Sequence, residues 1–194
     1  MELPEISIRN AGPADVDLLV ELGKLSFYEA FSEETAPEDM ADHLQTAFKV
    51  EDIKAQLNTD QSIFIILEID ASPAGYAYLQ PETPPDCVKD PNTIQLVRFY
   101  LRRKYYGRDV GNTLMKASLE KALSRGYRSV WLSSWELNHR ANSFYKKWKF
   151  QIVGRAKFKV GSDIQNDFIF CRSIFSQVEQ KASCCSSNHN IRIT

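Results

Sequence analysis

The sequence has almost no net charge, which removes the simplest basis for binding nucleic acid or an anionic membrane. Its 24 lysines and arginines are balanced by 25 aspartates and glutamates, which leaves a formal charge of -1 at pH 7. Proteins that bind nucleic acids or anionic surfaces usually carry a strong basic excess. We therefore expect no nucleic acid and no membrane among the partners of this chain.

Long apolar runs are also missing, and so is a recognisable leader. A membrane-spanning helix needs roughly 20 apolar residues, but even the run IFIILEI at residues 63–69 is interrupted by Glu68. The first ten residues, MELPEISIRN, lack both the basic start and the apolar stretch of a signal peptide. These absences predict a cytoplasmic protein.

Cysteine is scarce and its spacing is uninformative. The four cysteines are Cys87, Cys171, Cys184 and Cys185. They show neither a CxxC pattern nor the spacing of metal ligands, and adjacent cysteines such as the last two rarely bridge each other. We expect free thiols in a reducing compartment and no metal site.

The length and composition indicate a single domain with a short tail. With 194 residues, 43% of them hydrophobic, the chain can bury a substantial core. Its final stretch, KASCCSSNHNIRIT, has little that would pack against that core. We predict one domain over residues 1–175 and a disordered tail over residues 176–194.

The order of apolar patterns predicts a mixed sheet with helices. Strand-like and helical patterns alternate, and a loop with four prolines at residues 81–92 divides the chain. In the second half, strand, helix and strand follow each other, which requires a parallel crossover. The expected strands are residues 5–11, 62–69, 74–80, 93–101, 128–135, 150–158 and 164–172, and the expected helices are residues 16–27, 36–48, 110–124 and 138–148.

Two glycines, Gly107 and Gly111, flank the start of the helix expected at residues 110–124. A helix N-terminus presents unpaired backbone N–H groups and the positive end of the helix dipole, so it can bind an anion. Glycine lets the backbone approach a phosphate closely, and Arg108 would add a charge-assisted contact. The pattern is neither a P-loop nor the dinucleotide fingerprint. From the glycines alone, an ordinary strand-to-helix turn is the alternative.

Two segments resemble the cofactor half of the GNAT superfamily of N-acetyltransferases: VRFYLRRKYYGRDVGNTLM at residues 97–115 and VWLSSWELNHRANSFYKKWKF at residues 130–150. The resemblance implies an α/β (α+β) GNAT fold, with a mixed, mostly antiparallel central sheet of about seven strands and helices on both faces. It also implies acetyl-CoA as cosubstrate. The implied cofactor-binding residues are Phe99, Tyr100, Leu101, Gly107, Arg108, Asp109, Val110, Gly111, Asn112, Asn138 and Lys147.

The turn departs from the family pattern at several positions. The family's Gln or Arg falls on Tyr106 and its first motif glycine on Asp109, whereas Gly111 matches the second glycine. An aspartate beside a pyrophosphate is electrostatically unfavourable unless its side chain points to solvent, but aspartate tolerates the left-handed conformation. Lys149 stands where relatives usually end the helix with glycine, at a position where positive φ is common.

The resemblance also implies acetyl transfer by direct attack within a ternary complex. A backbone N–H of residues 99–101, where relatives commonly have a bulge, would polarise the thioester carbonyl. Tyr145 matches the family's helix tyrosine and would protonate the leaving thiolate; a core aromatic beside Phe144 is the alternative. Asn138 would bind the pantetheine arm or a water, and it is also a natural helix N-cap.

The general base is less evident. Relatives often have a glutamate where this chain has Val97, with Gln95 two residues earlier. Glu136 is our candidate, followed by Glu29 and Glu33, although each alone also fits an ordinary solvated carboxylate. A chain of waters to bulk solvent would also suffice.

The stretch EAFSEETAPEDMAD at residues 29–42 carries six acids and no base. Acids near Phe27, Tyr28 and Phe31 suit a long cation through ion pairs and cation-π contacts, and a solvated helical surface is the alternative. This region and GSDIQNDFIF at residues 161–170 resemble bacterial PaiA-type polyamine acetyltransferases. That resemblance implies spermidine or spermine as the acceptor, bound by Glu29, Glu33, Glu34 and Trp135.

The sequence therefore predicts an acetyl-CoA-dependent N-acetyltransferase for a small-molecule primary amine, acting as a monomer or homodimer. Acetylation of a protein or peptide amine is one alternative. A noncatalytic acyl-CoA-binding module is another, because Asp109 and Val97 depart from the family pattern. Thiol release from acetyl-CoA across a panel of amines distinguishes these readings.

Overall fold

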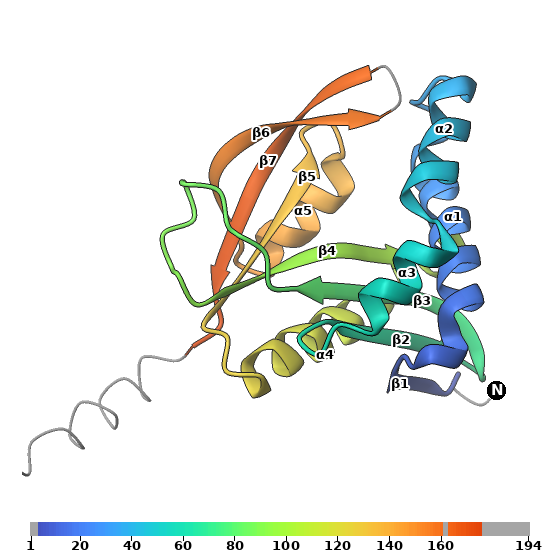
Figure 1. Cartoon of the computed structure of the whole chain (residues 1–194), viewed down its shortest axis with the longest axis horizontal. Coiled ribbons are helices and arrows are strands. Elements are labelled where there is room, and N and C mark those ends of the chain that lie inside the picture. The colour runs from blue at the N-terminus through green and yellow to red at the C-terminus, as the bar shows by residue number, and fades with distance from the viewer. Residues whose placement is uncertain (1–3, 161–162, 176–194) are drawn as a thin grey trace, which may run out of the picture.

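Seven strands form one mixed sheet in the order β1-β2-β3-β4-β5-β7-β6 (Figure 1). The computed structural model describes residues 4–160 and 163–175. Neighbouring strands are antiparallel except β4 and β5, which are parallel. The strands are β1 Ile6–Asn10, β2 Ile63–Ile69, β3 Ser72–Gln80, β4 Thr93–Leu101, β5 Ser129–Trp135, β6 Gln151–Val160 and β7 Asp163–Ser173. The predicted mixed, mostly antiparallel sheet is confirmed.

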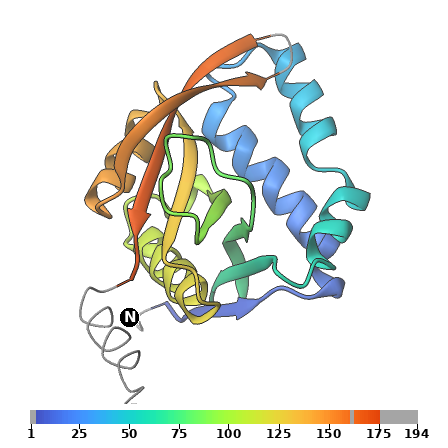
Figure 2. The same ribbon diagram turned by 60° about the vertical axis from the view of Figure 1, so that its left-hand side comes forward.

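Helices cover both faces of this sheet (Figure 2). Those of the described part of the chain are α1 Val16–Phe31, α2 Pro37–Ala47, α3 Val50–Leu57, α4 Val110–Ser124 and α5 His139–Lys147, with short 3-10 turns η1 Pro13–Asp15 and η2 Arg103–Tyr105. The sequence analysis did not expect α3, a two-turn helix with a single buried residue, Ile53. So short a helix carries a weak periodic signal.

The alternation of side chains along β2 explains the two main cores. Ile63, Ile65 and Leu67 pack with α4 and α5 on one face, whereas Phe64 and Ile66 pack with α1, α2 and α3 on the other. Successive residues of a strand point to opposite faces. A run that is apolar throughout therefore marks a strand covered on both sides.

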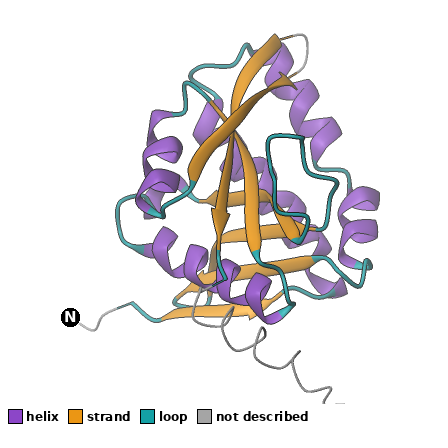
Figure 3. Ribbon diagram, turned by 90° about the vertical axis from the view of Figure 1, so that its left-hand side faces the viewer, coloured by secondary structure: helices purple, strands orange, loops and turns teal. Residues whose placement is uncertain are grey.

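The proline-rich loop that connects β3 and β4 lies over the sheet (Figure 3) and covers a smaller core. Val88 from this loop packs against Trp131 of β5 and Ile169 of β7. The loop therefore covers part of the sheet that α1, α2 and α3 leave open. Cys87 and Cys171, which border this cluster, are free thiols.

The irregularity in β4 lies earlier than the family resemblance implies. Arg98 pairs with Tyr78 of β3 and Leu96 pairs with Leu79, so Val97 is the extra residue. The expectation of a bulge at residues 99–101 is therefore wrong, because those residues pair regularly with β3. One inserted residue lets neighbouring side chains face the same side of the sheet.

Two non-glycine residues adopt the left-handed conformation where the family pattern has glycine. Asp109 has φ of 63° just before α4, and Lys149 has φ of 61° after α5. Such a backbone costs about 1 kcal/mol or more for a residue with a side chain. Because Lys149 keeps this conformation, the chain still turns from α5 into Phe150 and β6.

The described part of the chain holds no helix that is both long and apolar enough to cross a membrane. The tail predicted at residues 176–194 lies outside the described residues.

Candidate active site

A cavity of about 690 Å3 opens where β4 and β5 separate. The two strands pair only from Thr93 to Gln95 and from Ser129 to Trp131, and beyond this point they diverge (Figure 1). No described strand pairs with this edge of β4 between Leu96 and Leu101. Backbone N–H groups that point to the edge can therefore donate to a carbonyl placed in the cavity.

Four residues of the glycine turn line one end of the cavity, namely Gly107, Asp109, Gly111 and Asn112. Gly107 has φ of 74° and Asp109 begins α4 without a side-chain cap. The first N–H groups of α4 therefore remain available to an anion. Of the remaining predicted turn residues, Arg108 is exposed outside the lining and Val110 is buried in the core.

Gly111 is needed for space and not for an unusual backbone. A Cβ added here would lie 3.3 Å from Leu101 Cδ1 and 3.4 Å from Phe144 Cε2. Gly111 therefore lies close to the side chains of Leu101 and Phe144. The glycine keeps the start of α4 against the cavity wall.

The Asp109 carboxylate is directed toward a neighbouring side chain. It accepts a hydrogen bond from the Asn112 amide, and Asn112 Oδ1 accepts one from Trp148 Nε1 at 2.7 Å. This chain of hydrogen bonds ties the turn to the end of α5. The negative charge nevertheless stays beside the anion site, because Asp109 lines the cavity.

We expect Asp109→Gly to tighten acetyl-CoA binding by about two- to five-fold, because it removes a charge near the helix N-terminus. Glycine accepts the positive φ, so the turn is preserved. Calorimetry with acetyl-CoA measures the effect, and Asp109→Asn is the matched control that keeps the hydrogen-bonding shape. If both variants bound acetyl-CoA more weakly than the wild type, the Asp109 carboxylate would instead favour cofactor binding.

The far wall of the cavity comes from α5. Asn138 Oδ1 accepts a hydrogen bond from the Ala141 N–H at 3.1 Å, so Asn138 is an N-cap as well as a lining residue. Lys147, one of the predicted cofactor-binding residues, lines the cavity. Arg140 also lines it, with its guanidinium carbon 3.7 Å from the centroid of the Tyr106 ring. The sequence analysis missed Arg140 and Tyr106 as cavity residues, because a cation-π contact between distant segments leaves no local pattern.

Tyr145 lies inside the cavity wall and is only 8% exposed. Its ring packs near Phe99, Phe150 and Phe170. Burial raises the pKa of its hydroxyl, and Tyr100 adds to that effect. Tyr145 therefore remains protonated near neutral pH. Its packing is that of the core aromatic given as the alternative, and its place in the lining also allows the predicted role of general acid.

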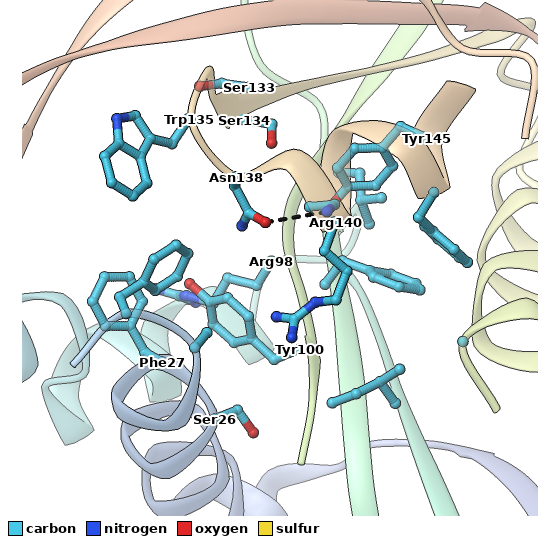
Figure 4. Close-up of a pocket in the computed structure, with 18 of the residues that line it drawn as sticks. Ser26, Phe27, Arg98, Tyr100, Ser133, Ser134, Trp135, Asn138, Arg140 and Tyr145 are labelled. Carbon is cyan, nitrogen blue, oxygen red and sulfur yellow. Dashed lines mark hydrogen bonds between the residues drawn. The ribbon is translucent and has the colours of Figure 1, made fainter. Parts of the chain in front are cut away.

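The other end of the cavity is rich in rings. Trp135 and Asn138 face Phe27 and Tyr100 across it (Figure 4). Phe31 lies 6.4 Å from Trp135, ring centre to ring centre. The remaining rings at this end include Phe48, Phe158 and His43, the last stacked on Phe27 at 4.2 Å. We call this part, with Phe27, Phe31, His43, Trp135 and Phe158, the acceptor end.

His43 and Arg98 define the charge of the acceptor end. Burial lowers the pKa of His43, and the nearby Arg98 lowers it further. His43 is therefore a neutral imidazole at pH 7. Arg98 donates to Gln56 Oε1 at 2.8 Å and to the Ala47 carbonyl at 3.1 Å, both neutral acceptors.

The predicted acids do not line the cavity. Glu136 accepts a hydrogen bond from the Asn166 amide at 3.2 Å. Glu29 forms an ion pair with Arg102 at 3.0 Å, and Glu33 forms one with Arg103 at 2.8 Å. Glu34 is exposed. Of the predicted substrate-binding residues, the structure brings only Trp135 into the lining.

Instead, a carboxylate from β7 reaches the cavity wall. Asp167 lines the cavity, is 5% exposed, and accepts a hydrogen bond from the Ser133 hydroxyl. Asp167 was not among the predicted site residues, because its nearness to β5 depends on the pairing of strands that lie more than 30 residues apart. An acid directly before the apolar run FIFC was the available signal.

Comparisons with known proteins agree with this geometry. The Acetyltransferase (GNAT) family matches residues 24–150. An uncharacterized N-acetyltransferase from the pepI 3' region of Lactobacillus delbrueckii subsp. lactis is 27% identical over 169 residues, which cover 87% of this chain and 98% of the relative. An uncharacterized N-acetyltransferase of Mycobacterium tuberculosis is 27% identical over 160 residues, which cover 82% of this chain and 98% of the relative.

Solved structures show the same fold. A PaiA N-acetyltransferase from Thermoplasma acidophilum in complex with coenzyme A matches with a TM-score of 0.71 and 20% identity, over 87% of this chain and 99% of that one. A GCN5-related N-acetyltransferase from Rhodopseudomonas palustris matches with a TM-score of 0.69 and 19% identity, over 89% and 98%. The chain therefore belongs to the GNAT family and is an acetyl-CoA-dependent N-acetyltransferase.

Proposed function

We propose that the acceptor is a primary amine on an extended aliphatic chain, a polyamine such as spermidine or spermine, acetylated by direct attack in a ternary complex. The supporting observation is the acceptor end of the cavity, where aromatic rings surround the space next to β4. Aromatic faces attract cations and also pack against methylene groups. Neutral His43 adds no competing charge there.

The acidic segment at residues 29–42 would bind the ammonium groups of such a polyamine that lie farthest from the reacting amine. Phe31 and Thr35 both line the cavity, and Glu33 and Glu34 lie between them in the sequence and are exposed. A second or third ammonium that projects from the cavity would meet these carboxylates. The resemblance of this segment to PaiA-type polyamine acetyltransferases supports this substrate class.

The chemical roles follow from the cavity walls. The free edge of β4 supplies backbone N–H groups for the thioester carbonyl, and the start of α4 supplies them for the pyrophosphate. Tyr145 is the general acid that protonates the departing thiolate. Asn138 and Lys147, which line the cavity, would border the pantetheine arm.

The test is thiol release from acetyl-CoA with amines of one to four positive charges. We expect kcat/KM to rise with charge at low salt and the preference to weaken at about 0.15 M salt, where the Debye length is about 8 Å. Replacing Glu33 and Glu34 together by Gln should raise KM for spermidine about two- to five-fold more than KM for a monoamine. The matched control is the exposed pair Glu51→Gln and Asp52→Asn on α3.

Equal losses for both amines would contradict the role of the acidic segment.

Arg98 favours one rival acceptor, a protein or peptide amine with a carboxylate nearby. The hydrogen bonds of its guanidinium go to neutral acceptors, so its positive charge is available to pair with a carboxylate of the substrate. Turnover of peptide amines without turnover of polyamines would support that rival. Binding of acetyl-CoA without thiol release would support a noncatalytic module. A cytoplasmic location and a monomeric or homodimeric state complete the proposal.

A further inference from the structure

Asp167 is a buried acid beside the acceptor end of the cavity. Among the described residues that line the cavity, Asp109 and Asp167 carry carboxylates, and Asp109 belongs to the glycine turn. Asp167 pairs directly with Trp135 of β5. Side chains of directly opposed residues lie on the same face of a sheet, about 5 Å apart at Cβ. The Asp167 carboxylate therefore lies beside the indole that faces Phe31.

The hydrogen bonding of this carboxylate is incomplete. Asp167 Oδ2 accepts a hydrogen bond from the Ser133 hydroxyl. Asp167 Oδ1 is buried and has no partner among the described residues. A buried carboxylate oxygen without a donor is costly. The site is therefore suited to a ligand that brings N–H donors and a positive charge.

We propose that Asp167 binds the ammonium group of the incoming acceptor and takes one proton from it, so that a neutral amine attacks the thioester. This inference rests on the proposed function only in requiring a primary amine as the acceptor. It applies equally to a polyamine and to a peptide amine.

The reaction balances with this assignment. The ammonium gives one proton to the Asp167 carboxylate, and the freed nitrogen lone pair forms the N–C bond. The electron pair of the breaking C–S bond goes to sulfur, which receives a proton from Tyr145. The nitrogen then loses its second proton, which restores Tyr145 through solvent, and the proton held by Asp167 leaves to bulk water. The sum is an amide, a thiol and one released proton.

The surroundings of Asp167 favour such a base. Burial raises the pKa of its carboxyl and the nearby Glu136 reinforces the rise, whereas the Ser133 hydrogen bond opposes it. His43 and Arg98 face the same cavity from α2 and β4. On the β6 side, Arg155 lies over Phe168, the residue next to Asp167. A raised pKa brings the basicity of the carboxylate closer to that of the amine.

Asp167→Asn is the decisive variant, because the amide oxygen can still accept the Ser133 hydrogen bond. We expect kcat/KM to fall about 100-fold or more with the best amine of a panel that includes spermidine, a monoamine and a peptide amine. The affinity for acetyl-CoA by calorimetry should stay within two-fold. Wild-type activity should fall as pH drops through the Asp167 pKa, since a protonated carboxyl accepts no proton. This acid limb should be missing in the variant.

Two further variants separate chemistry from stability. Asp167→Glu retains a carboxylate and should be more active than Asp167→Asn even if both melt at the same lowered temperature. Asp17→Asn makes the same chemical change at an exposed site on α1 and should keep activity within two-fold.

The outcomes distinguish the inference from the proposed function. An active Asp167→Asn with an unchanged pH profile would overturn the inference alone. Turnover of the peptide amine but not of spermidine would reject a polyamine as the acceptor. The effect of Asp167→Asn would then be measured with the peptide amine. A wild-type protein that acetylates no amine of the panel would contradict both.

Discussion

Tyr145→Phe should lower kcat by about 100-fold or more while the affinity for acetyl-CoA stays nearly unchanged. The ring packs near Phe99, Phe150 and Phe170, so phenylalanine preserves the wall of the cavity and removes only the proton donor. Because burial raises the pKa of the hydroxyl, the tyrosine is protonated over the whole working pH range. Steady-state thiol release at saturating amine measures the loss.

The matched control is Tyr76→Phe. Tyr76 is a fully buried tyrosine outside the cavity lining, and its hydroxyl has no partner among the described residues. We expect its kcat within about two-fold of the wild type. A Tyr145→Phe enzyme with wild-type kcat would reduce Tyr145 to the core aromatic that its packing also allows.

Gly111→Val should weaken acetyl-CoA binding by about 1–3 kcal/mol, the usual cost of overpacking a close contact. The added side chain meets Leu101 Cδ1 and Phe144 Cε2 and pushes the start of α4 away from the cavity wall. Calorimetry with acetyl-CoA gives the dissociation constant, and the melting temperature shows whether the variant remains folded.

A smaller substitution at the same position is the control for this prediction. Gly111→Ala adds only a Cβ at 3.3 Å from a flexible leucine end, so its loss should be clearly smaller than that of valine. Equal affinity of the valine variant and the wild type, in a folded protein, would remove the glycine turn from the cofactor site.

The sequence by itself predicted the parts of the site that depend on local structure. The turn at Gly107 directly precedes the start of α4, and Asn138, the N-cap of α5, lies two helical turns before Tyr145. Their periodicity, capping and glycine spacing are readable without knowing what packs against them. Asp109 also kept the left-handed backbone for which its residue type is suited.

Local sequence does not determine the partner of a charged side chain that has several opposite charges within reach. The predicted acids Glu29 and Glu33 are held by Arg102 and Arg103, more than 69 residues away, outside the cavity lining. A cluster of acids in a sequence shows charge, but it does not show which cation will neutralise it.

Only the tertiary structure decided that Asp167 lines the cavity and that the predicted acids do not. The pairing of β5 with β7 places Asp167 beside Ser133 and Trp135, and the divergence of β5 from β4 opens the space in front of them. Strand pairing depends on contacts between distant segments, and a shift of one residue would turn Asp167 to the opposite face. Local patterns therefore determined most of the elements and the glycine turn, whereas strand register determined that Asp167 lines the cavity.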